Sequence, residues 1–119
     1  MTFRDLVLDI LRTYPQQNPM HAEVLSEQLA SIESFDDEVN GYGAYSRLKI
    51  SPHVGSLPSE SSNGYLRNDL VVRMDGLAHE LQFVLSVDKN GIIHELEIVP
   101  SDGVGWDGTV SKYSIIAIS

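Results

Sequence analysis

Acidic side chains are the residues of this sequence whose types and spacing come closest to a catalytic set. Four of them fall in segments that alternate like β-strands: Asp69, Glu80, Glu95 and Glu97. Restriction-type nucleases hold metal ions with strand carboxylates of this kind, and a lysine two residues later stabilises developing negative charge. Here Gln82 follows Glu80 and Glu97 follows Glu95 at that spacing. The sequence therefore does not predict metal-dependent nuclease chemistry.

Other catalytic patterns are also incomplete. The four histidines are scattered without metal-ligand spacing, and the absence of cysteine excludes thiolate catalysis, disulfides and thiolate metal sites. No Gly-x-Ser-x-Gly nucleophile elbow occurs. The glycines of residues 103–108 superficially resemble a nucleotide-binding loop, but no Walker lysine follows, so we expect a turn before the last strand. We predict no catalytic residue, no cofactor and no metal.

Strand parity gathers the same acids on one face of a sheet. Turns predicted at Asp75-Gly76 and at residues 88–91 set a register that places Val72 opposite His79 and Phe83 opposite Leu96. In this register odd positions from Leu77 to Val87 point to a core, together with Leu96. His94 falls on that core face. The opposite face then carries Asp69, Val71, Arg73, Glu80, Gln82, Val84, Glu95 and Glu97. Four acids with a single base indicate either a docking surface for a positively charged partner or a solvated face.

Two further features are candidate contacts for a partner. The acids Asp36, Asp37 and Glu38 fall at the end of the second predicted helix, where negative charge opposes the helix dipole. They indicate either a solvated connector or an acidic prong that mimics nucleic-acid phosphates. Trp106, the one tryptophan, falls in the glycine-rich segment that we expect to be exposed, either as a packing plug or as a partner anchor.

Helical elements come first in the chain and strands follow. Apolar residues from Phe3 to Tyr14 recur at helical spacing, Thr2 and Asp5 form a capping-box pattern, and Pro15 is expected to end this helix. A second helix begins at Asn18-Pro19. Strands are predicted over residues 44–50, 66–74, 77–87, 92–99 and 109–118, with a long loop over 51–64. The predicted fold is α+β, an N-terminal helical hairpin (2–34) packed on one face of an antiparallel, meander-like sheet (41–119), in a single domain of residues 1–119.

Composition restricts the classes of partner. Among 119 residues, 17 are acidic and 8 are Lys or Arg, which gives a net charge of −9. This charge disfavours nucleic-acid and anionic-membrane binding and favours a basic protein partner. No secretory signal pattern or spanning apolar run is present, so we expect the protein in the cytoplasm.

Several motifs carry a resemblance to a known group. They are Asn68-Asp69-Leu70, Asp75-Gly76, residues 81–91, His94-Glu95-Leu96-Glu97-Ile98 and Ser101-Asp102-Gly103. Over roughly residues 22–103 the chain resembles small acidic bacterial immunity proteins of contact-dependent and other polymorphic toxin systems. Several relatives have cysteines near the first strand, where this chain has Tyr42-Gly43-Ala44. The resemblance implies binding and neutralisation of a cognate toxin, often a basic nuclease, and supplies no active-site residues.

The expected function is therefore that of a non-enzymatic immunity protein that covers the active site or substrate groove of a basic toxin. It would be a monomer or weak dimer when free. One alternative is an adaptor or structural domain that self-associates through a sheet edge. Another is a small-molecule binding protein with a pocket between helices and sheet, lined by Tyr42, Tyr45 and His94.

Overall fold

The capping pattern at the N-terminus starts the first helix as predicted. The computed structural model describes residues 1–118, and in it α1 covers Phe3–Leu11. The Thr2 hydroxyl accepts a hydrogen bond from the Asp5 N–H (3.1 Å), and the Asp5 carboxylate accepts one from the Thr2 N–H (2.8 Å). Hydrogen bonding of the Asp5 carboxylate to the backbone N–H and then to the side chain of Thr2 holds the pKa of Asp5 below its usual value. The predicted apolar stripe is buried at Leu6, Val7, Ile10 and Leu11.

The chain after α1 remains helical, in short pieces. Pro15 does not end the first helix; it lies in the first turn of α2 (Tyr14–Gln17), where its missing N–H leaves no bond unmade. A 3₁₀ turn (Pro19–His21) leads into α3 (Ala22–Ala30), which buries Leu25 and Gln28. All helices in residues 1–118 are too short for any of them to cross a lipid bilayer.

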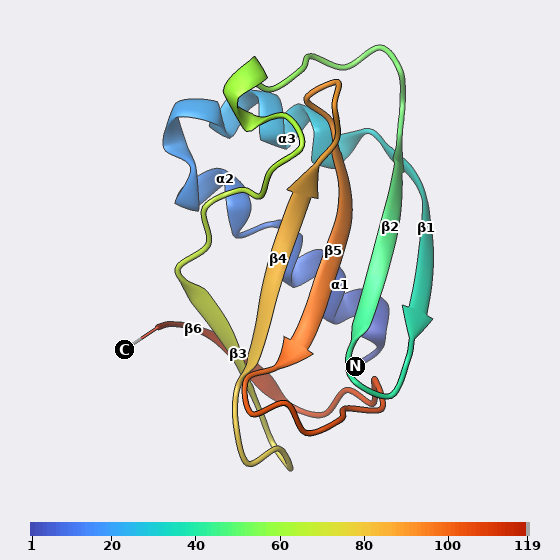
Figure 1. The fold of residues 1–119 in the computed structure, drawn as a ribbon, viewed down its shortest axis with the longest axis vertical. Coiled ribbons are helices and arrows are strands. Elements are labelled where there is room, and N and C mark those ends of the chain that lie inside the picture. The colour runs from blue at the N-terminus through green and yellow to red at the C-terminus, as the bar shows by residue number, and fades with distance from the viewer. Residues whose placement is uncertain (119) are drawn as a thin grey trace.

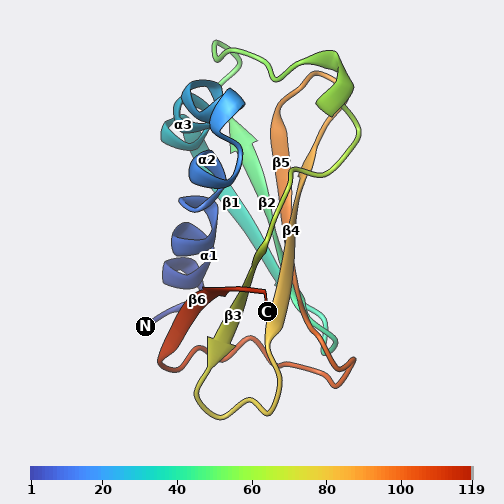
Figure 2. The same cartoon turned by 90° about the vertical axis from the view of Figure 1, so that its left-hand side faces the viewer.

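Six strands form one antiparallel, open sheet. They are β1 (Ile32–Val39), β2 (Ala44–Ile50), β3 (Leu70–Met74), β4 (Leu81–Val87), β5 (Ile93–Pro100) and β6 (Tyr113–Ala117). Their order across the sheet is β1-β2-β5-β4-β3-β6. The helices lie on one face of the sheet, and the other face is uncovered (Figures 1 and 2). The predicted α+β architecture is thereby confirmed, with one more strand than the sequence indicated.

The additional strand is β1. We expected the second helix to continue to Ser34 and the sheet to begin at residue 41, but the sheet begins at Ile32. Eight residues of β1 extend along β2, from Ile32 opposite Ile50 to Val39 opposite Ala44. The end of the predicted domain, residue 119, lies outside the described residues.

The loops that connect β3 to β4 and β4 to β5 are longer than predicted, but most side chains of these strands lie on the predicted face of the sheet. Phe83 lies opposite Ile98, where we expected Leu96, and Val72 lies opposite Leu81, where we expected His79. Both registers differ from the prediction by two residues. Because side chains alternate with a period of two, a shift of two returns each of them to its predicted face.

His94 is the exception to this parity. A bulge between Ser86 and Val87 leaves His94 without a partner, because Val87 pairs with Ile93 and Ser86 with Glu95. His94 is therefore exposed on the outer face and does not join the core, contrary to the prediction.

The core lies between the helices and the covered face of the sheet. Its main strand residues are Val72, Leu81, Phe83, Leu85, Ile93, Leu96 and Ile98, against Leu6, Ile10, Tyr14 and Leu25 of the helices. We call this covered side the inner face and the opposite side the outer face. The outer face is where the predicted acidic surface must be sought.

Candidate functional site: the outer face of the sheet

The centre of the outer face is β5, which presents Glu95 and Glu97. Leu96 and Ile98 alternate with these acids and are buried on the inner face, so the pleat directs both carboxylates outward. Across the sheet, Glu97 lies between Tyr45 of β2 and Val84 of β4. Glu95 and Glu97, two neighbouring acids on the outer face of β5, form the centre of the candidate site.

A row of charged residues crosses this face through Arg47. Arg47 lies between Asp36 of β1 and Glu95 of β5, with nitrogen–oxygen distances of 3.7 and 3.4 Å. Its guanidinium also lies 4.6 Å from the centre of the Tyr45 ring. Asp36 and Glu95 therefore share one internal cation, which was absent from the predicted acidic face.

The next row has no such cation. Its members are Glu38 of β1, Tyr45 of β2, Glu97 of β5 and Val84 of β4, which lie opposite one another in register. Within residues 1–118, neither Glu38 nor Glu97 forms an ion pair. Negative charge on the outer face is thus uncompensated in this row.

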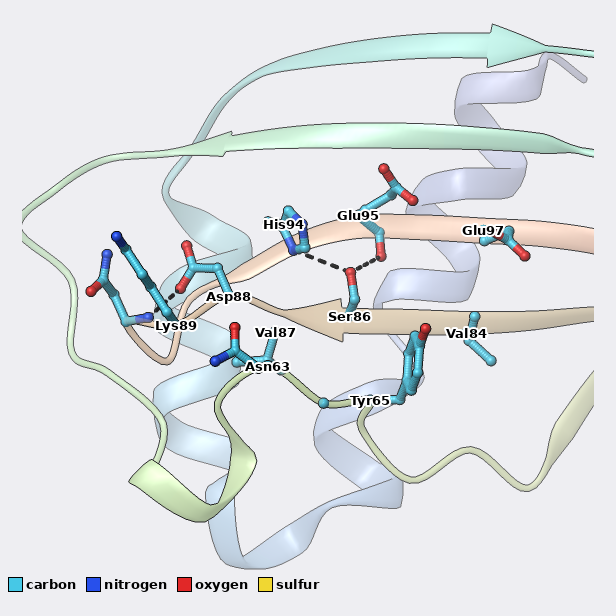
Figure 3. A pocket seen from close by; sticks show the side chains of 12 residues that line it. Asn63, Tyr65, Val84, Ser86, Val87, Asp88, Lys89, His94, Glu95 and Glu97 are labelled. Atoms are coloured by element: carbon cyan, nitrogen blue, oxygen red, sulfur yellow. Dashed lines mark hydrogen bonds between the residues drawn. The ribbon is translucent and has the colours of Figure 1, made fainter.

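Two hollows flank Glu95 and Glu97. The first, of about 560 Å³, lies between β4, β5 and the segment around Tyr65; Asn63, Tyr65, Val84 and His94 are among its lining residues (Figure 3). The second, of about 360 Å³, lies towards β2 and is lined by Tyr42, Tyr45 and Val99. Tyr42 and Tyr65 are 77% and 74% exposed. The site therefore combines carboxylates with accessible aromatic rings.

A serine and a histidine meet in the first hollow. Ser86 Oγ lies 3.1 Å from His94 Nδ1 and 3.2 Å from the Glu95 carbonyl oxygen, to which it donates (Figure 3). A nucleophilic serine would need its histidine oriented by a further group. In the described part of the chain, no carboxylate bonds the other ring nitrogen of His94. The contact ties β4 to the bulged end of β5.

The remaining two acids of the predicted face lie elsewhere. Asp69 pairs with Arg67 at 2.8 Å, next to β3, and Glu80 pairs with Arg73 at 3.3 Å. Hydrogen bonds from its own backbone N–H and from Arg73 hold the pKa of Glu80 below its usual value. Gln82 is on the outer face near Glu80, where it lines a smaller hollow. The four predicted acids therefore do not form one cluster: Glu95 and Glu97 are adjacent, and Asp69 and Glu80 each have an arginine.

The acidic run is divided between the two faces. Because it forms a strand and not a helix end, its side chains alternate. Asp37 points to the helices, where it pairs with Arg4 (2.9 Å) and accepts a hydrogen bond from Ser46 (2.6 Å). Asp36 and Glu38 remain with the outer face. The expected placement at the end of the second helix is therefore wrong, and the three acids do not share one surface.

Trp106 is not an exposed anchor. It is 3% exposed and packs against Phe3, with ring centres 6.1 Å apart, and its indole N–H donates to the Thr109 carbonyl oxygen. Residues 103–108 have the spacing Gly-x-Gly-x-x-Gly, but they lead into β6. No helix N-terminus is present there to bind a pyrophosphate.

Sequence reasoning did not place the residues of β2 and the loops on the acidic face: Arg47 was missed, and Tyr45 was expected in a pocket between helices and sheet. Tyr45 and Arg47 alternate with the buried Ala44, Ser46 and Leu48, and this parity was a usable signal once β2 is known to adjoin β5. Tyr42 and His94, which we expected in a pocket between helices and sheet, instead line hollows on the outer face. In residues 1–118, no group of three or more acidic or histidine side chains is arranged to hold a metal ion.

Comparisons with protein-family models, with curated proteins and with solved structures return no significant match to this chain. The resemblance to immunity proteins accordingly stays a prediction.

Proposed function

We propose that this protein is a non-catalytic binding domain that docks a basic protein on the outer face of β1, β2, β5 and β4. The observation that carries the proposal is the pair Glu95 and Glu97, set between two tyrosine-lined hollows on a face that no helix or strand of residues 1–118 covers. Aromatic side chains supply contact area in protein interfaces, and complementary charge directs the partner to the surface. A net charge of −9 acts in the same direction at longer range.

Within this class, an immunity protein for a basic nuclease-type toxin is the function that we favour. The motif resemblance over residues 22–103 and the acidity of the chain support it. In this role the outer face covers the toxin's active site or substrate groove and excludes nucleic acid. The protein would act in the cytoplasm, where such a toxin meets its substrate.

The test uses the product of the adjacent upstream gene. Cells that express its toxin domain should regain growth when this protein is co-expressed, and the two purified proteins should form a complex measurable by calorimetry. A neighbouring product without a toxin domain, together with no complex, would refute the toxin-specific proposal.

Charge reversal on the outer face tests where the partner binds. The double variant Glu95→Lys/Glu97→Lys should weaken the complex by at least about tenfold, because like charges then face each other. The matched control is Glu23→Lys on the opposite side of the molecule, where Glu23 is exposed on α3. Equal affinities for the outer-face variant and the parent protein would place the partner elsewhere.

Self-association through a sheet edge is the second candidate, and a difference between the two edge strands favours β6 for it. β1 carries four acids, which repel a second copy, whereas Tyr113–Ala117 of β6 contains no charged residue. Light scattering separates the candidates, because self-association produces a dimer without any partner.

A further inference from the structure

The hollow between β2 and β5 contains the components of a site for a cationic side chain. Its lining includes Tyr42, Tyr45 and Val99 together with Glu95 and Glu97. Arg47 also lines it, with its guanidinium paired to Asp36 and Glu95, so Glu97 is the lining carboxylate without an ion pair in residues 1–118. Aromatic and aliphatic walls contact the methylene groups of a long side chain, while carboxylates bind its charged end. We call this space the β2–β5 hollow.

The hollow is held in place by the turn between β1 and β2. Asn40 accepts hydrogen bonds from the N–H groups of Tyr42 and Gly43, both at 3.1 Å. Gly43 lies directly against β5, since a Cβ atom there would be 2.5 Å from the Ile98 carbonyl oxygen. The turn that carries Tyr42 is thus fastened to the strand that carries Glu97.

An arginine of this chain already shows how such a site is occupied. In one row, Arg47 lies between Asp36 and Glu95 and over the Tyr45 ring. The neighbouring row repeats the two carboxylates, with Glu38 and Glu97 on either side of Tyr45 in register. That row lacks a cation among the described residues, and the β2–β5 hollow opens beside it.

We propose that the β2–β5 hollow binds the guanidinium group of an arginine on the partner protein, with Glu97 as its carboxylate. The exposed Tyr42 ring is the wall on which the group stacks, because Arg47 already lies over the Tyr45 ring. This inference rests on the proposed function and specifies the chemistry of the partner at one position. Arginine fits better than lysine, because its planar group stacks on an aromatic ring while it donates two hydrogen bonds to one carboxylate.

The experiment uses small probes and the full chain. Backbone amide NMR signals of the labelled protein are followed during titration with N-acetylarginine methylamide and, separately, with its uncharged analogue N-acetylcitrulline methylamide. We expect saturable shifts at Tyr42, Gly43, Tyr45 and Val99 with the arginine probe and none with citrulline. Equal shifts with both probes would show that the positive charge plays no part and would overturn the proposal.

Two matched variants separate a local site from general attraction to an acidic protein. Glu97→Gln should weaken binding of the arginine probe about fivefold, the order expected for one exposed charge-assisted contact. Glu23→Gln makes the same change in net charge on α3 and should leave the affinity unchanged. Equal effects of the two variants, or shifts that map outside the hollow, would contradict the inference.

The two proposals fail in distinguishable ways. If the partner protein binds but the arginine probe does not, the hollow is not an arginine site and the partner docks through other contacts. If the probe binds as described but no basic protein does, the arginine site stands and the toxin-binding function is lost.

Discussion

The inner and outer faces of the sheet are made from the same strands and differ in almost every physical respect. Phe83 on the inner face is 1% exposed, whereas its neighbour Val84 on the outer face is 38% exposed. The inner face is covered by helices (Figure 2) and its apolar side chains are buried, while the outer face carries carboxylates, tyrosines and hollows. The comparison shows that burial against the helices uses only the inner face and leaves the side chains of the outer face exposed to solvent.

Polar side chains of the inner face are mostly hydrogen-bonded within the protein, whereas those of the outer face are more exposed to solvent. On the inner face several have fixed partners: Gln28 bonds Gly55 of the β2–β3 loop and the β4–β5 hairpin, Asp37 bonds Arg4 and Ser46, and Tyr113 bonds Asp9. Within residues 1–118, the buried Tyr14 hydroxyl is an exception without a hydrogen-bond partner. Buried polar groups need such partners because they have lost water. Glu97 on the outer face keeps its water, so it remains available to a partner protein.

The greatest change in stability should be seen when a side chain of the inner face is truncated and compared with a neighbour on the outer face. Phe83→Ala should lower the free energy of unfolding by about 3–5 kcal/mol, because it leaves a cavity against Tyr14. Val84→Ala, one residue along the same strand, should change it by less than about 0.5 kcal/mol. Denaturant unfolding measures both. Similar losses in the two variants would remove the basis of the comparison.

A buried amide on the inner face gives the next largest effect. Gln28 donates to the carbonyl oxygens of Gly55 (2.8 Å) and Gly91 (3.1 Å) and accepts from the Ile93 N–H (2.9 Å). Gln28→Ala removes the side-chain partner of the Gly55 carbonyl oxygen and of the Ile93 N–H, while the Gly91 carbonyl oxygen keeps the Leu57 N–H at 2.9 Å. The variant should cost about 2–3 kcal/mol in unfolding experiments. The control is Ser26→Ala, at an exposed position of the same helix. A loss no larger than that of the control would mean that water replaces the amide.

Tyr113 should show the pH dependence of an inner-face bond. Burial and the adjacent Asp9 carboxylate raise the pKa of Tyr113 above its ordinary value of 10.0. Its contribution to stability is therefore present in full below pH 10 and is lost as the pH rises beyond it.

Tyr113→Phe should cost about 1 kcal/mol at neutral pH and show less destabilisation between neutral and strongly alkaline pH than the parent protein. Thermal unfolding as a function of pH measures this, with Tyr42→Phe on the outer face as the control. If Tyr113→Phe lost as much stability at alkaline pH as the parent protein does, the pH dependence would not come from the Tyr113 hydroxyl.

The smallest effect on stability is expected from the charged row of the outer face. Arg47→Ala removes the contacts with Asp36, Glu95 and Tyr45, yet it should cost less than about 1 kcal/mol, because these side chains are solvated. The same change leaves two more carboxylates without a cation, so a basic partner should bind more tightly at low salt and lose that gain at high salt. Unfolding and calorimetry at two ionic strengths test both parts. If Arg47→Ala lowered the free energy of unfolding by several kcal/mol, the charged side chains of the outer face would be needed for stability.

Alternation of side chains could be predicted from the sequence even where pairing could not. Phe83, Leu85 and Leu96 were assigned to the inner face and Glu95 and Glu97 to the outer face, and the structure confirms both groups. The hairpin registers were wrong by two residues, a shift that preserves every face. His94 escaped the rule because a bulge inserts a residue, and a bulge depends on turn contacts that strand periodicity does not contain.

The site was less predictable, because it depends on which strands adjoin. Arg47 compensates Glu95 only because β2 pairs with β5, although more than forty residues separate the two in sequence. Asp36, Asp37 and Glu38 have low strand propensity, so nothing local indicated β1. Pairing with β2 imposes the strand on them and then sends Asp37 to one face and its neighbours to the other.

Side-chain periodicity and local hydrogen bonds were enough to predict the α+β class, the start of the first helix and the faces of the central strands from the order of the residues. Which carboxylates have a cation, where the hollows lie and that Trp106 is buried became known from the folded chain alone. Those features arise from side chains that approach across the sheet, and their free energy depends on distances that no local pattern of residues encodes.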